Sequence, residues 1–188
     1  MDEQKKERQE KSLVLEVLQF LLIAAFIVLP VRLFIAQPFV VNGASMEPTF
    51  DTGQYLIVDQ LSYRFESPKR GDVIVFKYPY DTSKYFIKRI IGLPGETVSI
   101  TDGIVTIKND ANPQGFSPSE PYAEESHDNL DPVTLTDQQY FVMGDNRTGS
   151  FDSRSWGPLD KKYIDGRPFV RLFPLQTMSI FPGHVTAI

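Results

Sequence analysis

YFIKRIIG, residues 85–92, is the clearest strand signal in the chain, because aromatic and β-branched residues fill it and a glycine ends it. Alternate residues of a strand share a face, so Phe86, Lys88 and Ile90 are expected to point to one side. Burial between two large apolar side chains disfavours a charged ammonium and would lower the pKa of Lys88 from its ordinary value of about 10.4. A lysine whose tip reaches water is the alternative for this residue taken alone.

Short β-rich segments, broken by turn residues, continue through the chain after Pro38. The others are Tyr55–Val58, Asp72–Phe76, Thr97–Thr101, Ile104–Lys108, Tyr140–Met143 and Pro168–Leu172. Asp102 and Gly103 carry the strongest two-residue hairpin signal. No segment after residue 37 has a long helical period, so the sequence predicts a mainly β body built on an antiparallel sheet. Residues 108–135 are rich in Pro, Asn, Ser, Glu and Asp, which predicts a surface excursion.

An apolar stretch, residues 13–36, precedes this body and is about long enough for a transmembrane helix, which needs roughly 20 apolar residues. The sequence therefore predicts a cytoplasmic segment at 1–12, a single transmembrane anchor at 13–36 and an extracytoplasmic domain at 37–188. Basic residues ahead of the span set this orientation, namely Lys5, Lys6, Arg8 and Lys11. A cleaved signal peptide and a buried core helix are the alternatives. The length of the stretch and the lack of any polar face at 21–29 favour the anchor.

Composition excludes several classes of site. The 188 residues include no cysteine, which excludes disulfides, thiolate nucleophiles and cysteine-bound zinc. The two histidines stand in no metal-binding or catalytic pattern, so we expect neither a metal nor another cofactor. The net charge of −5 belongs to the part that follows the apolar stretch, which argues against nucleic acid as a partner. We expect a monomer.

A serine, Ser45, stands in the stretch GASMEPT, residues 43–49, shortly after the apolar stretch. Gly43 permits close backbone approach or unusual dihedrals, and Pro48 prevents a helix from starting there. A serine hydroxyl is a poor nucleophile until a base takes its proton, and a neutral lysine can do so. Because a chain extends at most about 3.6 Å per residue, Ser45 would lie within roughly 30 Å of the bilayer edge.

Four segments carry a resemblance to a known family. They are SMEPT (45–49), RGDVIVF (70–76), IKRIIGLPG (87–95) and the stretch MGDNRTGSFDSRSWG (143–157). In this order they resemble the motif set of bacterial type I signal peptidases, in the compact form of Gram-positive bacteria. The resemblance covers the chain from the apolar stretch to about residue 174. It implies a serine endopeptidase, anchored in the cell membrane, that removes signal peptides from exported precursor proteins and cuts after small residues at positions −1 and −3. Its partners would be those precursors and the lipid bilayer.

The resemblance also implies roles for single residues. Ser45 would be the nucleophile, with its own backbone N–H in the oxyanion hole, and Lys88 the general base. Many relatives carry a serine at the position of Gly43, so this chain lacks a side-chain donor there. Ser150 would hold the lysine amine. The positions that would brace the site through ion pairs are Asp145, Arg147, Asp152 and Arg154, with Arg89 paired to Asp145.

The substrate would bind as an added strand, with alternate side chains in shallow pockets. The candidates for these pockets are Val41, Met46, Phe50, Phe86 and Ile87, and core packing is the alternative for each. Two other functions compete with signal peptide removal. A self-cleaving Ser/Lys protease of the repressor type would need a DNA-binding helical segment where this chain has its apolar stretch. A non-catalytic anchored β-module would have no use for Ser45 and Lys88.

Overall fold

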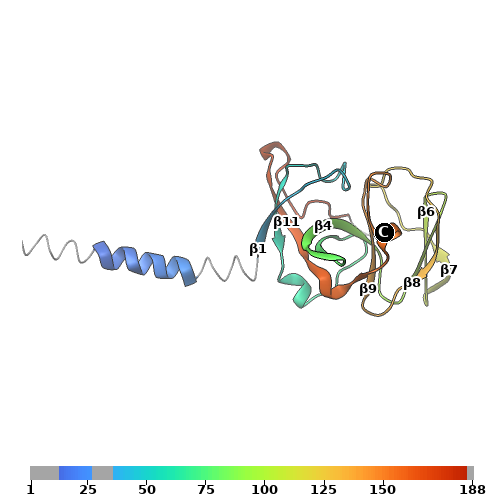
Figure 1. The fold of residues 1–188 in the computed structure, drawn as a ribbon, viewed down its shortest axis with the longest axis horizontal. Coiled ribbons are helices and arrows are strands. Elements are labelled where there is room, and N and C mark those ends of the chain that lie inside the picture. The colour runs from blue at the N-terminus through green and yellow to red at the C-terminus, as the bar shows by residue number, and fades with distance from the viewer. Residues whose placement is uncertain (1–12, 27–35, 186–188) are drawn as a thin grey trace, which may run out of the picture.

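The computed structural model describes residues 13–26 and 36–185 (Figure 1). Most of the second range is strand. The strands are β1 (Ala36–Val40), β2 (Tyr55–Asp59), β3 (Val73–Tyr78), β4 (Asp81–Gly92), β5 (Thr97–Thr101), β6 (Ile104–Asn109), β7 (Asn112–Phe116), β8 (Leu130–Thr134), β9 (Gln139–Met143), β10 (Leu159–Asp160), β11 (Ile164–Phe173) and β12 (Ser179–Ile180). The helical elements are residues 13–26, α2 (Ser153–Trp156), and the 3-10 turns η1 (Ser62–Arg64), η2 (Lys161–Tyr163) and η3 (Leu175–Thr177). The expectation of a mainly β body is confirmed.

The larger sheet has the strand order β1-β2-β11-β3-β4-β9-β10, with β12 paired to β11, and every pairing is antiparallel. Its central strand β3 is buried at all four positions from Val73 to Phe76, which is why the sequence there is a continuous apolar run. Ile74 of β3 faces Lys88 of β4 across the ladder. Lys88 therefore lies on a strand next to the centre of the sheet.

The smaller sheet has the order β7-β6-β5-β8 and lies at one end of the body in Figure 1. The β5–β6 hairpin turns at Asp102 and Gly103, both with positive φ, as the two-residue signal predicts. A buried apolar cluster joins the two sheets: Ile91, Val98, Ile100, Val105, Ile107, Leu135, Phe141 and Met143. The body is thus two sheets packed on a shared core.

The segment 108–135, expected to be a surface excursion, supplies two strands of this smaller sheet. The strands β7 and β8 contain Pro113 and Pro132 and pair only at the edges of the sheet, where a residue without an N–H is tolerated. Between them, residues 117–129 make polar contacts with the loop that follows β9 and with α2.

The expected anchor, residues 13–36, is described only in part. Residues 13–26 form a helix with most side chains exposed, residues 27–35 lie outside the described residues, and Ala36 already belongs to β1. Among the helices of the described residues, none has both the length and the apolar character needed to cross a bilayer.

Candidate active site

Ser45 lies in the loop between β1 and β2, and two buried side chains fix that loop. Met46 and Phe50 have no exposed surface and pack with Val41 in one core cluster. The Phe50 N–H donates to the Met46 carbonyl over 2.8 Å, which closes the turn that follows the serine. Gly43 precedes it with φ +106°, a conformation that favours glycine. The serine therefore stands on a turn held from both sides.

Lys88 lies on β4 with 4% of its surface exposed, and its Nζ is 2.6 Å from Ser45 Oγ. Burial lowers the pKa of Lys88 to about 8, with Arg154 acting in the same direction and Asp152 and Asp145 against it. Its Nζ also lies 5.7 Å from the ring centroid of Phe86, which shares the lysine's face of the strand as expected. The two expected reactive groups are thus within hydrogen-bond distance.

The loop after β9 holds the serine from its other side. The Asn146 N–H donates to the Ser45 carbonyl over 3.2 Å. A Cβ built on Gly144 would lie 2.3 Å from that same carbonyl oxygen and 2.3 Å from Ser150 Oγ. Only glycine fits between them, so this loop and the serine turn are in direct contact. Ser150 Oγ is buried there and has no hydrogen-bond partner among the described residues, so its expected bond to the lysine amine is not formed.

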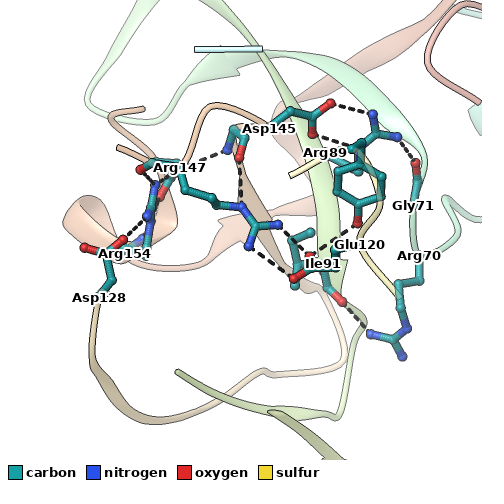
Figure 2. A network of polar contacts seen from close by, with 12 residues as sticks. Arg70, Gly71, Arg89, Ile91, Glu120, Asp128, Asp145, Arg147 and Arg154 are labelled. Carbon is teal, nitrogen blue, oxygen red and sulfur yellow. Dashed lines mark hydrogen bonds and ion pairs between the residues drawn. The ribbon is translucent and has the colours of Figure 1, made fainter. Parts of the chain in front are cut away.

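Arg89, the neighbour of the lysine, points to the opposite face of β4 and makes a fully buried ion pair with Asp145 (Figure 2). Nε and Nη2 of the arginine bind the two carboxylate oxygens at 2.8 and 2.6 Å. Nη1 donates to the carbonyls of Gly71 at 2.8 Å and Gly183 at 2.7 Å. The expected pairing of Arg89 with Asp145 is confirmed. The Thr49 hydroxyl adds a third bond to this carboxylate, at 2.6 Å from Asp145 Oδ2, which the sequence did not reveal.

Asp145→Ala is expected to lower the free energy of unfolding by about 3–5 kcal/mol, because it leaves the Arg89 guanidinium buried without its counter-charge. Urea denaturation followed by tryptophan fluorescence measures the change. Asp160→Ala removes an aspartate that pairs with Lys162 at 3.4 Å on the surface and serves as the control, with a loss below about 1 kcal/mol. Equal losses of unfolding free energy in the two variants would contradict the claim that the buried ion pair stabilises the fold more than the surface pair does.

The other two expected arginines are also bound. Arg154 Nη2 lies 2.7 Å from Asp152 Oδ2, and the same carboxylate caps α2 and accepts the Gly144 N–H at 3.0 Å. Arg147 Nε donates to the Gly144 carbonyl over 3.1 Å. Its guanidinium is paired with Glu120 at 2.6 Å. Sequence reasoning did not find Glu120, because it stands in a polar segment that resembles a solvated loop.

An open groove of about 300 Å³ runs past the serine and the lysine. Three of the five pocket candidates line it, namely Val41, Phe86 and Ile87. Met46 and Phe50 do not, since their side chains belong to the core cluster beneath the serine turn. For those two residues the structure agrees with the core-packing alternative. Phe39, Tyr85, Gly149 and Phe151 also line the groove.

This arrangement is suited to nucleophilic catalysis. A buried lysine loses its charge more readily than an exposed one, and in the neutral form it accepts a proton from a hydroxyl in contact with it. An open groove beside the hydroxyl gives access to an extended substrate.

Several known proteins that are named as signal peptidases are similar to this chain in sequence. Residues 14–173 match the family described as "Signal peptidase, peptidase S26". The chain is 40% identical over 166 residues to the "Probable signal peptidase I-1" of Synechocystis sp., a match covering 85% of this chain and 82% of the relative. It is 34% identical over 185 residues to the "Signal peptidase I" of Bacillus licheniformis, covering 92% of this chain and 96% of the relative. A crystal structure of a signal peptidase I from Enterococcus faecalis V583 is 31% identical, covers 54% of this chain and 97% of its own, and has a TM-score of 0.46.

The protein is therefore a hydrolase of the peptidase class. More particularly, the chain belongs to the signal peptidase family, peptidase S26, and the resemblance carried by its four motifs is confirmed.

Proposed function

We propose that this signal peptidase cuts its substrates with a Ser45/Lys88 dyad and releases exported precursor proteins from their signal peptides. The observation that carries the proposal is the 2.6 Å separation of Lys88 Nζ and Ser45 Oγ. No metal or other cofactor enters the chemistry proposed for this site.

In the first half of the reaction, neutral Lys88 takes the proton of the Ser45 hydroxyl while the oxygen attacks the scissile carbonyl. The resulting ammonium gives that proton to the leaving amine, and the Ser45 acyl ester remains. In the second half, Lys88 takes a proton from water, the hydroxide attacks the ester, and the proton returns to Ser45. The oxyanion formed in both halves is stabilised by the backbone N–H of Ser45. The N–H of Gly43 already donates to Thr52 Oγ1 at 3.0 Å, so it is not free for this purpose.

The substrate is proposed to bind as an extended strand along β4. This strand pairs with β3 along its length, but β9 covers its other edge only from Arg89 onward. On that second edge, no strand among the described residues pairs with residues 85–88, so their backbone groups beside the groove are open to an added strand. The apolar groove walls formed by Val41, Phe86 and Ile87 support small side chains at positions −1 and −3 of the substrate.

The apolar stretch 13–36 is proposed to anchor the enzyme in the cell membrane, with its N-terminus in the cytoplasm and the peptidase body outside. Support comes from the length of the stretch, the basic residues before it and the exposed apolar side chains of the helix at 13–26. This would hold Ser45 near the surface where a signal peptide leaves the bilayer.

The function is tested with the detergent-solubilised protein and a secretory precursor that carries alanine at −1 and −3. Cleavage at that bond, read by mass spectrometry of the new N-terminus, is the expected result. A matched precursor with phenylalanine at −1 is the control and should stay intact. Equal cleavage of the two precursors would contradict the proposed specificity, and cleavage of neither would contradict the proposed function.

The rate is expected to rise with pH through a midpoint near 8, because Lys88 has to be neutral to accept the Ser45 proton and its pKa is lowered to about 8. Below that value most of the enzyme carries the ammonium form and is inactive. The measurement is kcat/KM against pH from about 6 to about 10 on a fluorogenic peptide. A flat profile over this range would count against lysine as the base.

A further inference from the structure

Residues 117–129, here called the strap, connect β7 to β8 and lie across the arginines that brace the site (Figure 2). Each of these arginines has one partner on the strap. The Tyr122 ring centroid is 3.8 Å from the guanidinium carbon of Arg89. The other two contacts are ion pairs, Glu120 with Arg147 and Asp128 with Arg154.

The strap also bonds directly to the loop that holds the nucleophile. The Glu124 N–H donates to the Asp145 carbonyl over 3.0 Å. In the next residue of that loop, the Asn146 N–H donates to the Ser45 carbonyl over 3.2 Å. Two adjacent loop residues, Asp145 and Asn146, therefore link the strap to the serine turn through backbone hydrogen bonds.

A second route runs through side chains. The Glu120 carboxylate holds the Arg147 guanidinium with two bonds, at 2.6 and 3.1 Å. Arg147 in turn donates to the Gly144 carbonyl, and Gly144 has no room between Ser45 and Ser150. The side chain of Arg147 is 3% exposed, so loss of Glu120 would leave a buried cation that has to move toward water. Any such movement pulls on Gly144.

The far end of the strap is tied to the smaller sheet. The Gly103 N–H in the β5–β6 turn donates to the Asp128 carbonyl over 2.9 Å, and the Asp102 N–H donates to Asn129 Oδ1 over 3.0 Å. The strap is therefore fixed at both ends, on the smaller sheet and on the loop after β9. No residue of the smaller sheet lines the groove. The strap nevertheless connects that sheet, through hydrogen bonds, to the loop that holds Ser45.

We propose that Glu120 and Tyr122 are positioning residues for catalysis, which act by holding the loop at 144–147 against the serine turn and the buried lysine. The proposal rests on the proposed Ser45/Lys88 mechanism. Neither residue lines the groove, so the effect reaches the substrate only through the loop.

Loosening this loop would change the surroundings of Lys88. The charged groups that act on the lysine are Asp152, Arg154 and Asp145, and all three belong to the stretch that the strap covers. Water admitted beside the lysine would relieve the burial that lowers its pKa. A variant of the strap should therefore shift the rising limb of kcat/KM against pH along the pH axis. A loss of folded protein would lower kcat/KM at every pH and leave the position of that limb unchanged.

The test compares Glu120→Gln and Tyr122→Leu with the wild type by kcat/KM against pH and by thermal melting. Both variants are expected to lose about tenfold to a hundredfold in kcat/KM at pH 8 and to show a rising limb moved to higher pH. Tyr122→Phe keeps a ring over Arg89 and should lose less than Tyr122→Leu. Glu125→Gln removes an exposed carboxylate from the same strap and is the matched control, with an unchanged profile.

A rising limb that stays in place in both variants would overturn the proposal, whatever happens to its height. Failure of both variants to fold would also overturn it, because the strap would then be a folding element. These outcomes differ from failure of the mechanism itself, which would appear as a flat profile in the wild type.

Discussion

Lys88→Met is expected to reduce cleavage by about 10⁴-fold or more, because the methionine thioether cannot take the proton of Ser45. The same substitution should stabilise the fold near pH 7. The pKa of the buried lysine is lowered to about 8 from an ordinary 10.5, so the folded wild type below pH 8 must either bury a cation or give up a proton. Removal of this group is worth about 3 kcal/mol, and the gain should fade as pH rises from 8 to 10.5, where the unfolded chain also loses its proton.

Activity by mass spectrometry and stability by urea denaturation at pH 7 and pH 10 measure both effects in one variant. The control is Lys84→Met, which removes an exposed lysine from the same strand, paired at 2.9 Å with Asp81. It should cut at the wild-type rate. Cleavage by Lys88→Met at a rate near the wild type would show that another group is the base. Lost activity together with lost stability would point to misfolding and would leave the buried-charge argument wrong.

Ser45→Ala is expected to remove cleavage to a similar extent, about 10⁴-fold or more, while leaving binding of the precursor close to normal. The hydroxyl is the atom in contact with Lys88, whereas the groove walls and the open edge of β4 do not depend on it. Single-turnover kinetics with excess enzyme measures the chemical step, and fluorescence anisotropy of a labelled precursor peptide measures binding.

The matched control for the nucleophile is Ser155→Ala, an exposed serine on α2 that lies outside the groove. It should behave as the wild type in both measurements. A Ser45→Ala variant that still forms product at the wild-type rate would refute an acyl ester at this position. If that variant also failed to bind the peptide, the Ser45 hydroxyl itself would contribute to binding, which would contradict the expected separation of binding from chemistry.

Five strands of the larger sheet, β2, β3, β4, β9 and β11, could be predicted because their signal is local, whereas β1 and the two-residue strands β10 and β12 were not predicted. Apolar runs such as Val73–Phe76, bounded by turn residues, specify strands without reference to the rest of the chain. β7 and β8 were not predicted as strands, since the proline in both NPQGF and LDPVT, and the glycine in NPQGF, resemble a loop. They form strands because the neighbouring hairpin offers them a partner edge.

The site was less accessible from residues alone. Ser45 and Lys88 stand 43 positions apart, and no local pattern encodes their contact; the resemblance to a family supplied it. Met46 and Phe50 illustrate the opposite difficulty. Their closeness to the serine in sequence suggested the groove, but the turn directs both side chains into the core. The strap residues Glu120 and Tyr122 gave no signal. They stand in a polar segment, and the sequence does not distinguish a carboxylate in a buried ion pair from one exposed to water.

The bond from Arg89 to the Gly183 carbonyl has a consequence for biosynthesis. Translation adds residue 183 some 94 positions after the arginine, so a nascent polypeptide carries both reactive groups long before the bracing network is complete. A chain that ended before residue 183 would contain the nucleophile and the amine, but Arg89 would lack the Gly183 carbonyl as a hydrogen-bond acceptor. In a newly made chain, the set of hydrogen bonds that holds Arg89 is therefore complete only after residue 183 has been added.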